Sequence, residues 1–141
     1  MAGKQYLNAF INNSAIIREA VAANITDAAH KAVVYDNDGR LALPAADGDP
    51  AVGVILSDAA AYDNGTSLIT VAGTEVDVLI CKIGLIEVGE AVKKGDLLTV
   101  STTGQAKKAA SGDFILGTAM TDATTVGELV HIQITKSGYA K

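Results

Sequence analysis

Tryptophan is absent from this 141-residue chain, and aromatic residues make up only 4% of it. Pockets for small molecules are usually lined by aromatic side chains, so this scarcity favours a core of small aliphatic residues over a large ligand pocket. The chain has one cysteine, Cys81, which excludes a disulfide framework within the chain. Because Cys81 lies in the apolar run 76–83, we expect a buried structural thiol.

Basic residues are also few: 11 Lys and Arg face 16 Asp and Glu, and the net charge is −5. Duplex binding needs clustered basic residues that displace counterions, so nucleic acid is not expected as the main partner. No segment approaches the ~20 apolar residues of a membrane-spanning helix. The first residues contain no apolar run of a secretory signal. We therefore expect a protein that is made in a cytoplasm and has no membrane partner.

Motifs for catalysis and metal binding are missing as well. There is no glycine-rich phosphate loop, and no Ser/His/Asp arrangement stands out. One cysteine with His30 and His131 does not make a plausible zinc site. An EF-hand loop with Gly39 at its sixth position would place Val34 and Ala45 at ligand positions, where neither can ligate. We predict no catalytic residue, no metal site and no cofactor.

One stretch, residues 88–98, is similar to the half-motif of biotinyl and lipoyl domains, in which glycine turns place strands in a flattened barrel. Those domains carry a modified lysine in a Met-Lys-Met or Asp-Lys-Ala tripeptide. Neither tripeptide occurs in this sequence. The stretch therefore indicates a strand–turn–strand corner without a swinging cofactor.

Short β-rich runs separated by turn residues fill the chain from residue 31 onward. The turns that end in Gly39 and Gly65 contain the Asp and Asn residues typical of tight hairpins. In the last run, Val130, Ile132 and Ile134 alternate with polar residues, as in a half-buried strand. Strands at this spacing predict an all-β fold, a small β-barrel or sandwich. The predicted strands are residues 32–35, 41–43, 52–56, 67–71, 75–82, 85–88, 97–100, 105–107, 114–120 and 128–135.

The first 30 residues differ from the rest and contain one glycine, Gly3. Ile16, Ile17, Ala20 and Val21 fit helical spacing, which leaves a short helix over residues 14–24 open beside a strand or an extended arm. We predict an N-terminal arm, residues 1–30, that is partly helical in one interpretation. A β-barrel domain, residues 31–141, follows it.

The chain contains one internal repeat, in which residues 39–53 resemble residues 104–117. Each copy has a hairpin turn, a strand, the pattern Ala-Ala-x-Gly-Asp and a second strand. Asp49 and Asp113 are placed to accept hydrogen bonds from turn amides. Gly53 and Gly117 lie within strands, where glycine often marks a bulge or a close backbone approach. Two such hairpins packed face to face would give a pseudo-symmetric barrel.

Three stretches follow one another in the second half: GEAVKKGDLLT at 89–99, GDFILGTAM at 112–120 and GELVHIQI at 127–134. With the surrounding turns, this order resembles the capsid decoration (cement) and head-fibre proteins of tailed phages, over residues 32–139. The resemblance implies a non-enzymatic virion protein on the outer capsid surface, where it binds the major capsid protein and stabilises coat-protein contacts. It also implies a homotrimer. The chain has no heptads and no Gly-x-y run, which favours a compact cement module over a long fibre.

In such a protein, the N-terminal arm would dock on the coat protein or on the other copies of the trimer through apolar anchors. The alternative is that these side chains pack on their own barrel. The candidate interface residues are Tyr6, Leu7, Phe10, Ile11, Ile16 and Ile17.

Two other functions stay open on the sequence alone. The first is the base of a head fibre, or a carbohydrate-binding adhesion module on the virion, although sugars usually stack on aromatic rings that are scarce here. The second is a small hydrolase, for which no nucleophile and base pattern is present.

Overall fold

The computed structural model describes residues 13–58 and 60–141, and all structural statements below concern these residues. They form thirteen strands and no helix, so among them no helix is long and apolar enough to cross a membrane. The strands are β1 (Ile16–Ala20), β2 (Ile25–Thr26), β3 (Ala32–Tyr35), β4 (Leu41–Ala42), β5 (Gly53–Ile55), β6 (Tyr62–Asp63), β7 (Leu68–Thr70), β8 (Glu75–Leu79), β9 (Lys82–Glu87), β10 (Leu97–Val100), β11 (Ala106–Lys108), β12 (Phe114–Ala119) and β13 (Leu129–Tyr139).

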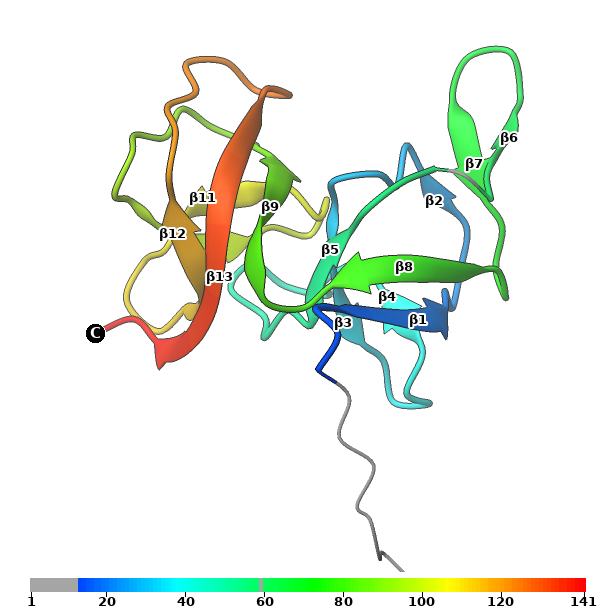
Figure 1. Cartoon of the computed structure of the whole chain (residues 1–141), viewed down its shortest axis with the longest axis horizontal. Coiled ribbons are helices and arrows are strands. Elements are labelled where there is room, and N and C mark those ends of the chain that lie inside the picture. The colour runs from blue at the N-terminus through cyan, green and yellow to red at the C-terminus, as the bar shows by residue number, and fades with distance from the viewer. Residues whose placement is uncertain (1–12, 59) are drawn as a thin grey trace, which may run out of the picture.

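Two five-stranded antiparallel sheets lie side by side and account for most of the chain (Figure 1). Their strand orders are β1-β8-β5-β3-β4 and β9-β13-β12-β10-β11. A third sheet, β2-β7-β6, is small and belongs to the first half of the chain. The all-β prediction is therefore confirmed.

The two large sheets are built in the same way. Val21 forms an isolated parallel bridge with Leu41, and Val88 forms the same bridge with Ala106. The amide-to-carbonyl hydrogen bonds of the turns and loops also recur at equivalent places. In the first half they join His30 to Ile55, Asp36 to Arg40, Val21 to Thr74 and Gly73 to Val21. In the second half the equivalent bonds, in the same order, join Gly95 to Ala119, Ser101 to Gln105, Val88 to Glu128 and Gly127 to Val88. We call residues 16–80 repeat one and residues 83–139 repeat two.

This repetition confirms the internal repeat of the sequence and extends it to the two five-stranded sheets. Gly53 pairs with Val33 of β3, and Gly117 pairs with Leu98 of β10. A β-carbon on Gly53 would overlap the carbonyl oxygen of Leu79, and one on Gly117 would overlap that of Gln133. Both glycines thus mark the close backbone approach that was predicted. They are needed because no side chain fits between the paired strands.

The predicted aspartate contacts are also present in both repeats. The Asp49 carboxylate accepts hydrogen bonds from the amides of Ala45 and Ala46, at 3.0 Å each. The Asp113 carboxylate accepts one from the Ala110 amide at 2.9 Å. These contacts close the turn before β5 and the turn before β12.

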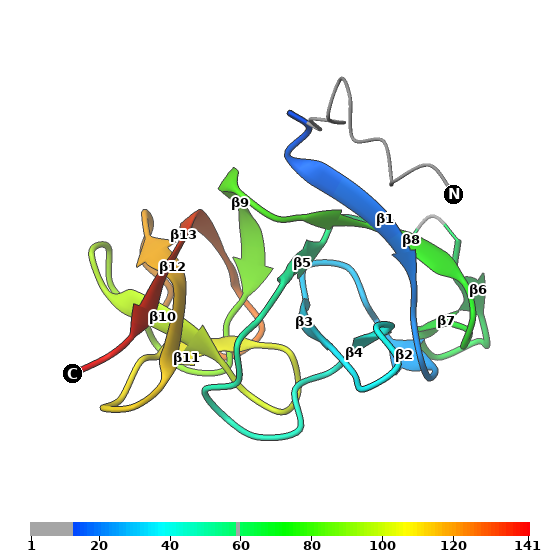
Figure 2. The same cartoon turned by 90° about the horizontal axis from the view of Figure 1, so that it is seen from below.

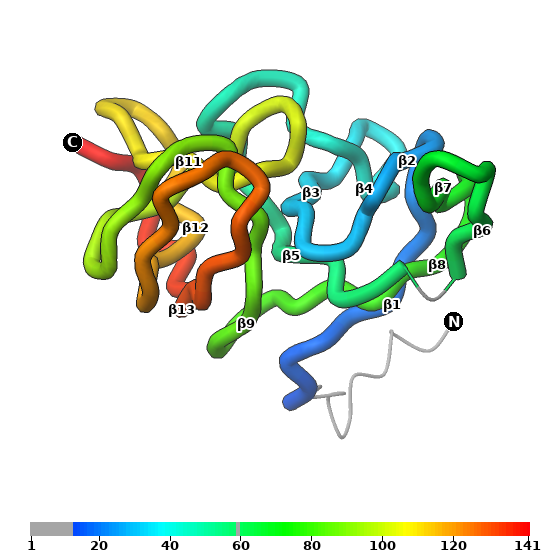
Figure 3. The backbone as a smooth tube through the Cα atoms, turned by 90° about the horizontal axis from the view of Figure 1, so that it is seen from above, coloured from blue at the N-terminus to red at the C-terminus, as the bar shows by residue number. Residues whose placement is uncertain are grey.

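The arrangement of the repeats differs from the expected barrel of two face-to-face hairpins. Each repeat forms its own sheet, and the connection between β4 and β5 lies beside the turn between β10 and β11 (Figures 2 and 3). One buried cluster belongs to repeat one, around Leu41, Ile55 and Val78. The other fills repeat two and also includes Ala32 and Val54 of repeat one. The second core therefore continues across the contact between the repeats, which we call the junction.

The helix considered for residues 14–24 is wrong, because Ile16–Ala20 form β1 and pair along their whole length with β8. Short segments gain little from helix propensity alone, and pairing with a neighbouring strand overrides it. Ile25 and Thr26 of β2 likewise form an antiparallel pair with β7. The division of the chain at residue 30 stays a prediction.

Cys81 is partly exposed, whereas a buried thiol was expected. The apolar run 76–83 is interrupted at Ile80 and Cys81, between β8 and β9, and Lys82 has a positive φ of 69°. The chain turns there from repeat one to repeat two, so the thiol lies in a connection outside both cores. The break between strands that was predicted near Gly84 therefore lies earlier in the chain, at Ile80 and Cys81.

Candidate interaction site

Only two of the six predicted interface residues lie in the described part of the chain. Ile17 is half-buried and packs against the core of repeat one. Ile16 is 41% exposed on β1, the edge strand of its sheet. The other four, Tyr6, Leu7, Phe10 and Ile11, lie outside the described residues. A role of these six in an interface stays a prediction.

Charged and polar contacts hold the edge strand β1 to its sheet. Arg18 Nε donates to Asp77 Oδ1 of β8 at 2.9 Å, and this hydrogen bond holds the pKa of Asp77 below its usual value. Tyr35 Oη donates to Glu19 Oε1 at 3.0 Å. Burial, followed by this contact, raises the pKa of Tyr35. A charged edge strand resists uncontrolled pairing with other sheets, so any partner at β1 must accommodate these groups.

The hairpin β6–β7 has no counterpart in repeat two and projects from the molecule (Figure 1). In repeat two, Asp122 and Thr125 are joined by a short connection at the equivalent place. Tyr62 is 53% exposed on this hairpin, and Leu68 is 36% exposed. Exposed apolar groups on a projecting element are suited to contact another protein. The predicted turn at residues 63–66 marks the hairpin in the sequence, and repeat two has no corresponding residues.

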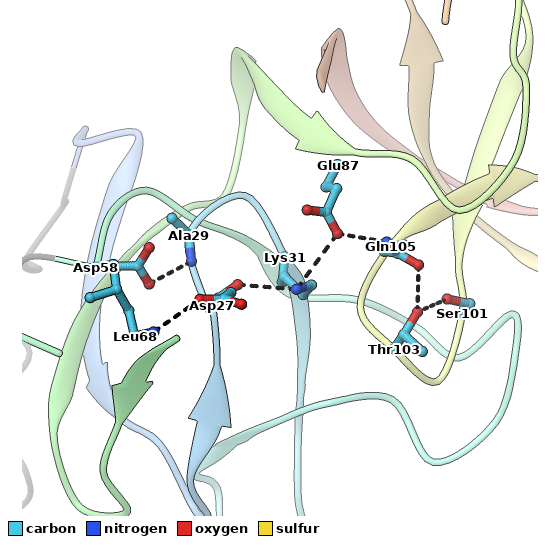
Figure 4. A network of polar contacts seen from close by, with 9 residues as sticks. All are labelled: Asp27, Ala29, Lys31, Asp58, Leu68, Glu87, Ser101, Thr103 and Gln105. Atoms are coloured by element: carbon cyan, nitrogen blue, oxygen red, sulfur yellow. Dashed lines mark hydrogen bonds and ion pairs between the residues drawn. The ribbon is translucent and has the colours of Figure 1, made fainter. Parts of the chain in front are cut away.

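A chain of polar contacts crosses the junction between the repeats (Figure 4). Lys31 Nζ of repeat one lies 3.6 Å from Glu87 Oε2 of repeat two, and both side chains are largely buried. Gln105 Nε2 donates to the same Glu87 oxygen at 2.6 Å. Thr103 and Ser101 continue the chain on the repeat-two side through their hydroxyl groups. Lys31 Nζ also donates to the Asp27 carbonyl at 3.1 Å within repeat one, so the ion pair links two groups that each have a partner in their own repeat.

The connection between β4 and β5 provides the second part of the junction. The Gly48 amide donates to the Val100 carbonyl at 2.9 Å, and the Phe114 amide donates to the Gly48 carbonyl at 3.0 Å. Asp47 Oδ2 pairs with Lys107 Nζ at 3.0 Å, which lowers the pKa of Asp47 and raises that of Lys107. Backbone and side-chain contacts together fix one repeat against the other.

A hollow with a volume of about 460 Å³ lies beside Val92 and Ala123. Its two carboxylates are already engaged in closing turns. Asp96 Oδ2 accepts the Lys93 amide at 2.8 Å, and Asp122 Oδ1 accepts the Lys94 amide at 2.7 Å. These groups act as structural acceptors that close the turns beside the hollow.

Metal-ligating and titratable side chains are dispersed over the described residues. No group of three His, Cys, Asp or Glu side chains that could hold a metal ion occurs among residues 13–58 and 60–141. His131 is exposed on β13, as the alternation of that strand predicts. His30 lies at the junction, where its carbonyl accepts the Glu87 amide at 3.0 Å.

Comparisons with known proteins show what the chain is similar to. A family model described as the structural cement protein (E217 gp24/Pam3 gp6) matches residues 7–135. None of the curated proteins matches the sequence. Among solved structures, the N base of the head fibre gp8.5 of bacteriophage phi29 is similar, with a TM-score of 0.63 and 20% sequence identity. The match covers 89% of this chain and 98% of that one, so the two share a fold.

Proposed function

The chain belongs to the family of structural cement proteins of phages, and from this premise we propose that it binds the major capsid protein on the outer surface of the head. The observation that carries the proposal is the family match, which extends over nearly the whole chain. The projecting hairpin supports it, because exposed apolar side chains such as Tyr62 are suited to contact another protein.

The proposed action is stabilisation of contacts between neighbouring coat proteins. A cement protein that touches more than one coat subunit raises the free energy needed to separate them. Several weak contacts per assembly give high avidity without a strong single interface, so three linked copies would bind far better than one. We therefore propose a homotrimer. Nucleic acid and membrane have no part in this function, nor does catalysis, and the net charge of −5 is consistent with a protein partner.

The experiment compares virions with and without the gene. Purified virions should contain the protein in multiple copies, and heads that lack it should lose DNA at lower temperature or in osmotic shock. Addition of the purified protein to these heads should restore their stability. A protein that is absent from virions, or that does not bind the heads at any concentration, would contradict the proposal.

Two regions are proposed to contact the coat protein. The first is the N-terminal arm, with Tyr6, Leu7, Phe10 and Ile11 as anchors, and the second is the hairpin that carries Tyr62. Deletion of residues 1–12 leaves β1 and its contact with β8 intact, so it tests the arm alone. Tyr62→Ser tests the hairpin, and Thr66→Ser in the same hairpin is its matched control. Loss of head binding in one variant, with unchanged unfolding, identifies the contact.

A second candidate function is the base of a head fibre. The similarity to the phi29 N base in fold, over 98% of that chain, favours it as an alternative. Electron microscopy of wild-type and gene-deleted virions separates the two functions. A fibre that disappears with the gene indicates a base, whereas a less stable head without any loss of fibres indicates cement.

A further inference from the structure

The junction uses different surfaces of the two repeats. Repeat one contributes what we call face A: Lys31, Ala32, Asp47 and Gly48. Repeat two contributes the Phe114 amide, which donates to the Gly48 carbonyl, and what we call face B: Glu87, Val100, Thr102, Gly104 and Lys107. No equivalent position occurs in both sets. The contact is therefore head-to-tail, and each repeat retains one face that the junction does not use.

The unused faces are defined by the repeated hydrogen bonds and strand pairs. Face A of repeat two consists of Asp96, Leu97, Ser111 and Gly112, which are equivalent to the four face A residues of repeat one. The Gly112 amide, unlike that of Gly48, already donates to the Ala140 carbonyl of its own copy at 2.8 Å. Face B of repeat one consists of Ala20, Tyr35, Asn37, Gly39 and Ala42, which are equivalent to the five face B residues of repeat two.

Large apolar side chains are exposed on both unused faces. Ala32 and Val100 are fully buried in the junction and its core, each with 0% exposure. Their equivalents Leu97 and Tyr35 are 47% and 46% exposed. Exposed apolar groups at positions equivalent to those of an existing contact are suited to contact another protein. Both faces thus have the character of an interface without its partner.

The turn between β10 and β11 and the equivalent turn between β3 and β4 show the same contrast in exposure. Gly104 is buried, and a β-carbon there would lie 3.1 Å from the β-carbon of Lys31. The equivalent Gly39 is exposed, and a β-carbon there would have no neighbour within 4 Å. The hairpin turn of repeat two is therefore covered by repeat one, whereas the equivalent hairpin turn of repeat one is exposed.

The charges of the unused faces are complementary as well. In the junction, Lys31 and Gln105 meet at Glu87. The positions equivalent to Lys31 and Gln105 are occupied by Asp96 and Arg40. A contact of the same geometry between two copies would therefore bring the Asp96 carboxylate, which also accepts the Lys93 amide, near the Arg40 guanidinium, which also pairs with Asp36 and Asp38. A carboxylate and a guanidinium form charge-assisted hydrogen bonds.

We propose that copies of this chain associate head-to-tail, with face A of repeat two of one copy packed on face B of repeat one of the next. The occupant of each unused face is a second copy, seated as repeat one is seated on repeat two. A head-to-tail contact closes into a ring when its rotation permits. The proposal rests on the self-association proposed above and specifies the surfaces that the homotrimer uses.

The test is a disulfide placed at the predicted contact between copies. The β-carbon neighbours of the junction, positions 31 and 104, correspond to Asp96 in one copy and Gly39 in the next. Separate Asp96→Cys and Gly39→Cys variants, each in a Cys81→Ser background, are mixed under oxidising conditions. The mixture should form a disulfide-linked heterodimer in high yield, and neither variant alone should form a homodimer.

Three outcomes overturn the proposal: a homodimer from Asp96→Cys alone, which indicates a symmetric contact; equal linkage to a Thr66→Cys control on the hairpin; or no linkage either in concentrated solution or on decorated heads. As an independent measurement, Leu97→Asp and Tyr35→Asp should each abolish self-association in sedimentation equilibrium without changing the circular dichroism spectrum. Association that survives both substitutions also contradicts it.

Failure of the contact and failure of the cement function are distinguishable in the same samples. Heads that bind the reduced variants as they bind the wild type, without any head-to-tail linkage, would retain the cement function and remove the proposed contact. Linkage in solution together with no binding to heads would do the opposite.

Discussion

Gly53→Ala and Gly117→Ala should destabilise the fold by the same amount, because each adds a β-carbon that overlaps a backbone carbonyl of the neighbouring strand. The oxygen atoms belong to Leu79 and Gln133, and neither can rotate away as a side chain could. Overfilling a packed site costs about 1–3 kcal/mol, and a fixed backbone obstacle places both variants at the upper end. Replacement of glycine restricts the unfolded chain and returns about 0.4–1 kcal/mol.

The net loss is therefore about 2 kcal/mol for each variant, which lowers the melting temperature of a chain of this size by about 6–8 °C. Urea unfolding followed by far-ultraviolet circular dichroism measures the free energy, and an unchanged m-value would show that the two states keep their compactness. Gly127→Ala is the control. Its β-carbon would meet nothing within 4 Å, and only its φ of 90° is unfavourable, at about 1 kcal/mol. A variant pair within about 0.5 kcal/mol of wild type would refute the argument from strand crowding, since surface substitutions reach that size.

Other substitutions test the junction, the edge strand and the repeat separately. Glu87→Ala should lower the free energy of unfolding by about 2 kcal/mol, because the lysine and glutamine that it joins across the junction lose a charged acceptor; urea unfolding measures this, and wild-type stability would show that the network contributes nothing. Arg18→Met should remove a stabilisation that is present above pH 3.8, the ordinary pKa of Asp77, and that wild type loses as the pH falls through the lower folded-state pKa; the two proteins should converge in stability in acid, and a constant difference would contradict the assignment. Gly95→Ala, at a φ of 96°, should destabilise by about 1 kcal/mol in calorimetry. His30→Gly, at the equivalent position with a φ of 65°, should stabilise by a smaller amount, and a loss there would argue against the equivalence.

The turn chemistry of the chain made most of the fold predictable. The strands at residues 32–35 and 97–100 have the predicted bounds, because each is followed by a turn whose glycine has a positive φ, Gly39 or Gly104. Such turns depend on local geometry, and local geometry is visible in a sequence. The repeat was detected at its glycine and aspartate positions for the same reason. The strands between them have diverged, since many aliphatic residues fill a core equally well.

Features that depend on distant partners were not predictable. The segment 16–20 carries a helical pattern of Ile and Ala, and only its pairing with β8 makes it a strand. The junction joins Lys31 to Glu87 through folding of both repeats, and no local pattern marks either residue. Ile17 was predicted as an interface residue, but it packs against the core of repeat one. Leu97 is marked as an interface candidate only by its structural equivalence to Ala32, which no local sequence pattern reveals.

The junction is formed by two parts of a single chain, which changes what it must supply. Tethered repeats meet at an effective concentration on the order of millimolar, so the small side chains of Ala32 and Val100 suffice to hold them. Separate copies must also overcome the loss of translational and rotational freedom, for which larger groups such as Leu97 and Tyr35 are suited. The junction within one chain forms independently of protein concentration, whereas the fraction of associated copies rises with protein concentration. A head surface that gathers many copies would then act as the trigger that assembles them, while dilute protein stays apart until it arrives there.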